Sequence, residues 1–142
     1  MEQLHDLGII LAWTGSVTGI MLYTYFHRSC AAFTSQGDLS APCQSLWDIA
    51  FVFVAALGAS LTLNDERIAV VGFLFVHFAA SGLFVLALSM PSVLGVVDPG
   101  VSDALLTRSV SIAFRYDFPP FSLVTSFIGS FIGLFVAGRF DL

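Results

Sequence analysis

Apolar residues gather in four long stretches along this chain, and short polar segments separate them. The stretches cover roughly residues 7–26, 46–64, 68–91 and 118–138, and Asp48 is the one charged side chain within them. A transmembrane α-helix needs about 20 predominantly apolar residues. The second stretch is the shortest, because its uncharged part covers only residues 49–64. It can span if Ser45, Leu46 and Trp47 extend it into the headgroup layer. The pattern predicts an all-α integral membrane protein in which residues 1–142 form one domain with four transmembrane helices.

Between the third and fourth stretches, the chain changes to an amphipathic pattern. Polar side chains recur every four residues, which places them on one side of a helix; they are Asp103, Thr107, Ser111 and Arg115. Leu106, Val110 and Ala113 lie on the other side. We expect a short helix over residues 102–114 that lies in the membrane interface. The alternative is an amphipathic helix that packs on a protein partner.

The connection between the second and third stretches is short. Asn64 is a good N-cap residue for the third helix, and Asp65 and Glu66 then fall in its first turn. We therefore expect the second and third helices to form an antiparallel hairpin of neighbours.

Small residues repeat at helical spacing in the first and last stretches. In membrane helices such residues let two backbones approach closely. The predicted packing residues are Gly8, Ala12, Gly15 and Gly19 in the first stretch, and Ser126, Gly129, Gly133 and Ala137 in the last. Gly129 and Gly133 form a literal GxxxG motif. We expect the tightest helix contact at the last stretch.

The composition narrows the range of partners. Charged residues make up 11% of the chain, against about 25% in a soluble domain. Five basic and ten acidic residues give a net charge of −5, which argues against binding of nucleic acid. The expected partners are other membrane subunits and lipids, including structural lipids.

His77 lies near the middle of the third stretch and is the main candidate for chemistry. An ionisable side chain within a membrane is a functional candidate by default, as a proton relay or a haem or pigment ligand. The alternative is a neutral imidazole that is hydrogen-bonded to a neighbouring helix. His5 and His27 flank the first stretch, each roughly 16 Å from its centre at 1.5 Å per residue. A haem on His77 would therefore need a second ligand from outside this chain, and we expect no cofactor.

Two further pairs of residues are predicted to interact. Arg28 follows the first stretch and Asp48 opens the second, so an ion pair between them is geometrically natural. Cys30 and Cys43 lie in the connecting loop, at a spacing that a disulfide can bridge. Such a bridge would place this loop in an oxidising compartment. His27 with the two cysteines is too irregular a set to predict a metal site.

The sequence contains no phosphate-binding loop, nucleophile elbow or paired-histidine metal motif, so we do not expect an enzyme. The leading hypothesis is an accessory subunit of a larger complex in an energy-transducing, respiratory-type membrane. The mitochondrial inner membrane is favoured over a bacterial one, because the start of the chain does not read as a secretory signal and a disulfide fits the oxidising side. A homo-oligomeric transporter or channel with His77 and Asp48 in its path is the first alternative. A haem- or pigment-binding subunit that uses His77 is the second.

Overall fold

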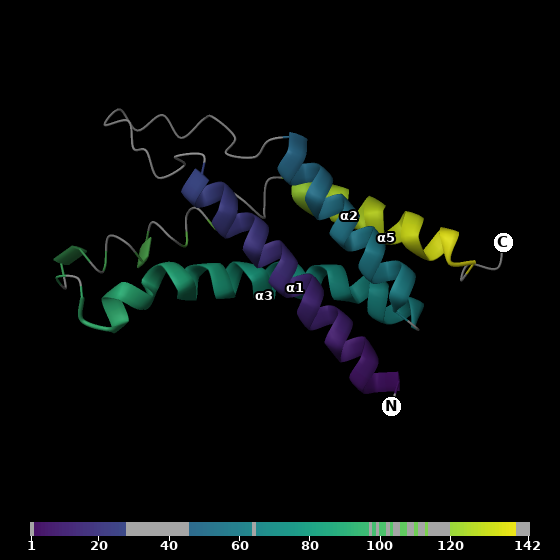
Figure 1. Cartoon of the computed structure of the whole chain (residues 1–142), viewed down its shortest axis with the longest axis horizontal. Coiled ribbons are helices and arrows are strands. Elements are labelled where there is room, and N and C mark those ends of the chain that lie inside the picture. Colours follow the sequence, from purple (N-terminus) through teal and green to yellow (C-terminus); the bar gives the residue numbers. More distant parts are fainter. Residues whose placement is uncertain are drawn as a thin grey trace.

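The computed structural model describes residues 2–27, 46–63, 65–96, 98, 100, 101, 103, 106, 107, 110, 113 and 120–138. Its named elements are all helices: α1 Glu2–His27, α2 Leu46–Thr62, α3 Glu66–Val93 and α5 Pro120–Val136. Within these residues there is no strand, so the all-α prediction is confirmed for them. In Figure 1, α1 crosses α3, while α2 and α5 lie side by side.

The helices fall into two length classes. The stretches Leu4–Phe26 of α1 and Arg67–Val93 of α3 are long and apolar enough to cross a membrane. The other two helices are apolar but shorter, at 17 residues each. Length and composition thus support two spans among the described residues, and they do not confirm the prediction of four.

The first helix begins earlier than its apolar pattern indicated, at Glu2 rather than near residue 7. The third helix and the last one both end close to a glycine with positive φ. Gly95 has φ 69° and Gly138 has φ 67°, a left-handed conformation that favours glycine and ends a helix. Pro91 lies in the last turn of α3 without stopping the helix before Val93.

The long helices α1 and α3 run in the same direction where they cross. A Cβ added at Gly72 of α3 would lie 3.3 Å from Cδ1 of Ile10 on α1. Farther along both helices, the rings of Tyr25 and Phe84 pack edge to face with centroids 5.7 Å apart. Because contacts advance along both sequences together, the two helices are parallel.

The shorter helices α2 and α5 are also parallel to each other, whereas α5 runs against α3. Gly129 of α5 lies against Phe53 of α2, and Gly133 lies against Leu57 one turn later. The rings of Phe73 on α3 and Phe127 on α5 are 5.4 Å apart, and His77 lies beside a residue earlier in α5, Leu123. The helices therefore alternate in direction along the chain.

The connection between α2 and α3 differs in detail from the expected hairpin. Asp65 is the N-cap of α3, since its carboxylate accepts a hydrogen bond from the backbone N–H of Arg67 at 2.8 Å. Asn64, the cap expected from the sequence, lies outside the described residues. The two helices make limited contact, because α2 packs chiefly against α5 and α1.

Residues 102–114, the predicted interfacial helix, are described at five positions, and all five are helical, as are Gly100 and Val101 just before them. Asp103 and Thr107 are exposed, as expected for a polar stripe. Leu106 and Val110 are partly exposed, at 38% and 40%, whereas Ala113 is buried in the main apolar cluster. The location of this helix in a membrane interface stays a prediction.

Candidate functional site: the helix interfaces and His77

The outer surface of the described helices is apolar on every helix. The exposed large apolar side chains include Leu7, Leu11, Phe26, Phe51, Val54, Phe75, Phe78, Leu86, Phe131 and Phe135. A soluble monomer rarely exposes a contiguous apolar patch of more than a few hundred Å². An exterior of this kind indicates contact with lipid or with other protein.

The interior holds many of the polar side chains. The buried ones are Asp6, Thr14, Thr24, Asp48, Ser60, His77, Ser89, Ser122, Ser126 and Ser130. Some hydroxyls bond to their own helix, as Thr14 does to the carbonyl oxygen of Ile10 at 2.8 Å. The buried set combines these polar side chains with apolar ones such as Trp13, Val17 and Phe84. Buried polar groups and extensive exposed apolar surface are the two features that differ from a typical soluble domain.

The closest helix contact in the described part is the seam between α2 and α5. A Cβ added at Gly129 would lie 2.8 Å from the carbonyl oxygen of Phe53, and one at Gly133 would lie 2.8 Å from that of Leu57. A real Cβ does not approach that closely, so this backbone spacing requires glycine at both positions. Ser126 is fully buried at the same seam, and Ala137 is half-buried just beyond the helix end.

Three serine hydroxyls are buried in and around this seam. Ser60 lies against Gly133, with its Cβ 2.9 Å from the position of an added Cβ. The hydroxyls of Ser60, Ser126 and Ser130 have no hydrogen-bond partner among the described residues. The role of serine here is therefore mainly its small volume, which lets α2 and α5 approach each other closely.

The small residues of α1 do not lie at a contact with another described helix. Gly8, Ala12, Gly15 and Gly19 are all exposed, and a Cβ added at any of the three glycines would meet nothing within 4 Å. Within the chain itself they therefore do not pack another described helix. Their packing role stays a prediction for a contact outside this chain.

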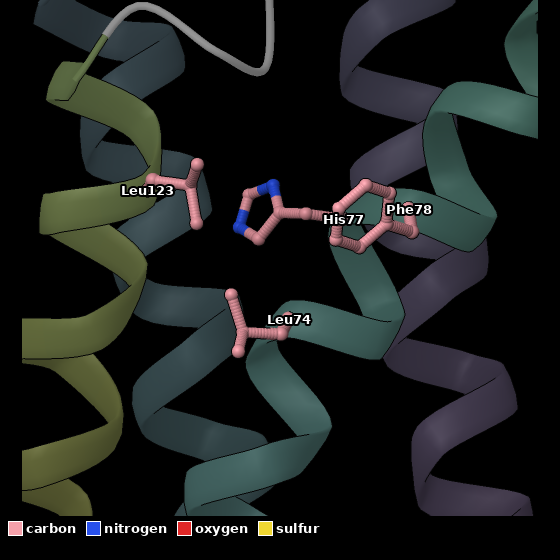
Figure 2. Close-up of a pocket in the computed structure, with 4 residues that line it drawn as sticks. All are labelled: Leu74, His77, Phe78 and Leu123. Atoms are coloured by element: carbon pink, nitrogen blue, oxygen red, sulfur yellow. The ribbon is translucent and has the colours of Figure 1, made fainter.

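His77 lies between α3 and α5, with 4% of its surface exposed. Its imidazole points from α3 toward Leu123 on α5, with Leu74 one turn away (Figure 2). These residues and Phe78 line a cavity of about 60 Å³ in which His77 is the one polar residue. Because Leu74 and Phe78 are exposed on the outer face, the cavity lies near the apolar exterior.

The size of this cavity limits what His77 can hold. One water needs about 10–15 Å³ of such space, so a cavity of about 60 Å³ has room for a few waters. The structural and the ligand interpretations of His77 both stay predictions.

The other predicted pairs lie largely outside the described residues. Asp48 is buried in the first turn of α2, where a carboxylate is favoured by the helix dipole. Its expected partner Arg28, and the cysteines Cys30 and Cys43, lie outside the described residues.

One buried carboxylate was missed by reasoning from sequence. Asp6 is buried in α1, and its carboxylate lies 3.4 Å from Nδ1 of His5, which is exposed. In the sequence, Asp6 is a carboxylate near the start of the first helix, where acidic residues are common. No sequence signal therefore indicates that it is buried. Among the described residues, no three His, Cys, Asp or Glu side chains gather to bind a metal ion.

Comparisons of the chain with protein-family models, curated proteins and solved structures find no match.

Proposed function

We propose that this protein is a four-span helical membrane protein that serves as an accessory subunit of a larger membrane complex. The observation that carries the proposal is the extent of apolar surface on the outside of the described helices, together with the polar side chains among the buried positions. Large apolar side chains cover the outside of α1, α2, α3 and α5, while the buried positions include serine, threonine, aspartate and histidine. Lipid tails are as apolar as leucine, so this exterior suits a bilayer.

The direction of the helices supports four spans rather than two. In a chain that crosses the bilayer four times, the first and third helices run one way and the second and fourth run the other. The contacts give this arrangement, since α1 is parallel to α3, α2 is parallel to α5, and α5 opposes α3. The N-terminus, the connection at Asp65 and the end of α5 then lie on one side.

The buried polar side chains and the small cavity at His77 support an accessory role over transport or catalysis. The buried polar side chains are mostly small hydroxyls within helix contacts. The cavity beside His77 is small and otherwise lined by Leu74, Phe78 and Leu123. Exposed small residues on α1 leave a face at which a helix of another subunit can pack closely.

A respiratory-type membrane, with the mitochondrial inner membrane favoured, remains the proposed location. It rests on the sequence alone, through the cysteine pair. The proposed partners are other membrane subunits and structural lipids.

The test is extraction of the tagged protein from its native membrane in a mild detergent. We expect it to stay in the membrane pellet at alkaline pH and to migrate on a native gel with a set of larger membrane proteins. Migration as a homo-oligomer that carries solute after reconstitution would favour the transporter instead. Release from the membrane at alkaline pH would remove the proposal altogether.

A further inference from the structure

The exposed tryptophan and tyrosine side chains of the described helices lie at one end of the bundle. Tyr23 is 56% exposed near the end of α1, and Trp47 is 71% exposed in the first turn of α2. Because α1 and α2 run in opposite directions, the end of α1 and the start of α2 lie at the same end of the bundle (Figure 1). Trp13, halfway along α1, is buried instead.

The opposite end of the bundle carries exposed ionisable side chains. His5 on α1 is exposed there, and so are Asp65 and Arg67 at the start of α3. Between the two ends, no Asp, Glu, Arg or His of the described helices is exposed, since Asp48 and His77 are buried. The exterior therefore changes along the bundle from charged, through uncharged, to aromatic rings that carry a polar group.

The distance between these two ends matches the thickness of a bilayer. Tyr23 follows His5 by 18 residues in one continuous helix, which is about 27 Å at 1.5 Å per residue. The hydrocarbon core of a typical bilayer is about 30 Å thick. Both residues lie inside α1, so this length does not depend on where the other helices begin or end.

The chemistry of the two aromatic side chains identifies the layer that they contact. Indole and phenol combine a flat apolar ring with one polar group, an N–H in tryptophan and an O–H in tyrosine. Such side chains are enriched at the membrane–water interface, where the ring stays among the acyl chains and the polar group reaches the headgroup level. The position of Tyr23 and Trp47 at one end of an otherwise uncharged exterior fits this layer.

We propose that Tyr23 and Trp47 form an aromatic anchor that binds the glycerol and ester-carbonyl layer of phospholipids, on the side of the membrane where α1 ends and α2 begins. The inference rests on the proposed membrane location. Ester carbonyl oxygens accept hydrogen bonds from the indole N–H and the phenol O–H. The anchor fixes the depth of the bundle, because His5 and Arg67 then lie at the opposite interface.

The test uses tryptophan fluorescence as a depth reporter in the full chain. The reporters are Trp47 itself, Tyr23→Trp and Phe75→Trp. Phe75 is a matched control, since it is 60% exposed and lies about 12 Å along α3 from Arg67, midway between the two ends. Both substituted variants also carry Trp47→Phe, and Trp47→Phe alone gives the background signal of Trp13. Each protein is reconstituted in phosphatidylcholine vesicles whose acyl chains carry bromine, a quencher of tryptophan, either near the carbonyl group or near the terminal methyl group.

We expect shallow bromine to quench Trp47 and Tyr23→Trp more strongly than deep bromine, so the shallow-to-deep quenching ratio is above one at both and below one at Phe75→Trp. A ratio of one or less at Trp47 or Tyr23→Trp, or no quenching there while Phe75→Trp is quenched, would overturn the aromatic anchor and leave the membrane location standing. A ratio above one at all three positions would also overturn the anchor, because the exterior would then show no order of depth. No quenching of any reporter would overturn the membrane location as well.

Discussion

At the scale of single residues, His77 is the side chain whose role matters most. Burying an imidazole among apolar groups costs free energy unless its nitrogens are hydrogen-bonded. The ring lies between two helices next to a cavity with room for a few waters. A structural role and a role in proton transfer make opposite predictions for substitutions that keep its polarity.

We expect His77→Gln to preserve both assembly and activity of the proposed parent complex, because glutamine keeps a polar group of similar reach. His77→Leu should cost on the order of 1 kcal/mol of stability, since hydrogen bonds between transmembrane helices average about 0.6 kcal/mol. Native-gel assembly and turnover of the complex are the measurements. Loss of turnover in a fully assembled His77→Gln complex would identify a relay or a ligand, because glutamine does not titrate and ligates haem poorly.

The cap of α3 gives a second prediction at this scale. Asp65→Ala removes the acceptor for the N–H of Arg67 and should destabilise the protein by about 1 kcal/mol. Asn64→Ala is the matched control, with an expected change below about 0.5 kcal/mol. Unfolding by sodium dodecyl sulfate in micelles, followed by circular dichroism, measures both. A larger loss of stability in Asn64→Ala than in Asp65→Ala would identify Asn64 as the N-cap, as expected from the sequence.

At the scale of elements, the seam between α2 and α5 depends on the absence of side chains at two positions. Backbone carbonyl oxygens of α2 lie where a Cβ of α5 would stand. Such oxygens belong to the helix ladder and cannot move aside without loss of hydrogen bonds. The seam is therefore less tolerant of added volume than the exposed faces.

Gly133→Leu should separate the two helices and cost at least about 2 kcal/mol, because overpacking against backbone has no cheap relief. Phe131→Leu, on the exposed side of α5, should change stability by less than about 0.5 kcal/mol. The same detergent unfolding experiment compares the two. Equal stability of Gly133→Leu and the unmodified protein would mean that the seam is looser than the contacts with Leu57 and Ser60 indicate.

At the scale of the whole molecule, the proposed orientation in a membrane can be tested at the cysteines. If Cys30 and Cys43 are bridged, the intact chain should be lighter than the reduced chain by the mass of two hydrogen atoms. Mass spectrometry with and without reductant measures this difference. Equal masses would remove the argument that the loop faces an oxidising compartment, because reduced thiols are typical of the opposite side.

The sequence alone determined the helical class and the position of the main helices. Continuous apolar stretches of this length have few other solutions, since helices satisfy their own backbone hydrogen bonds. The close helix contact of the last stretch could also be predicted, because Gly129 and Gly133 stand at the spacing that brings two helix backbones together. The exact ends were less so: α1 begins at Glu2 and the N-cap of α3 is Asp65.

The tertiary structure decided which faces meet. The small residues of α1 and those of α5 look alike in sequence, yet Gly133 packs closely on α2 while Gly15 meets nothing. The second helix packs chiefly on the last one rather than on its neighbour in the chain. The physical reason is that the outward faces here are as apolar as the inward ones. Sequence periodicity then identifies a face of small side chains or of bulky side chains on each helix. Which helix each face contacts is decided only when all the helices pack together.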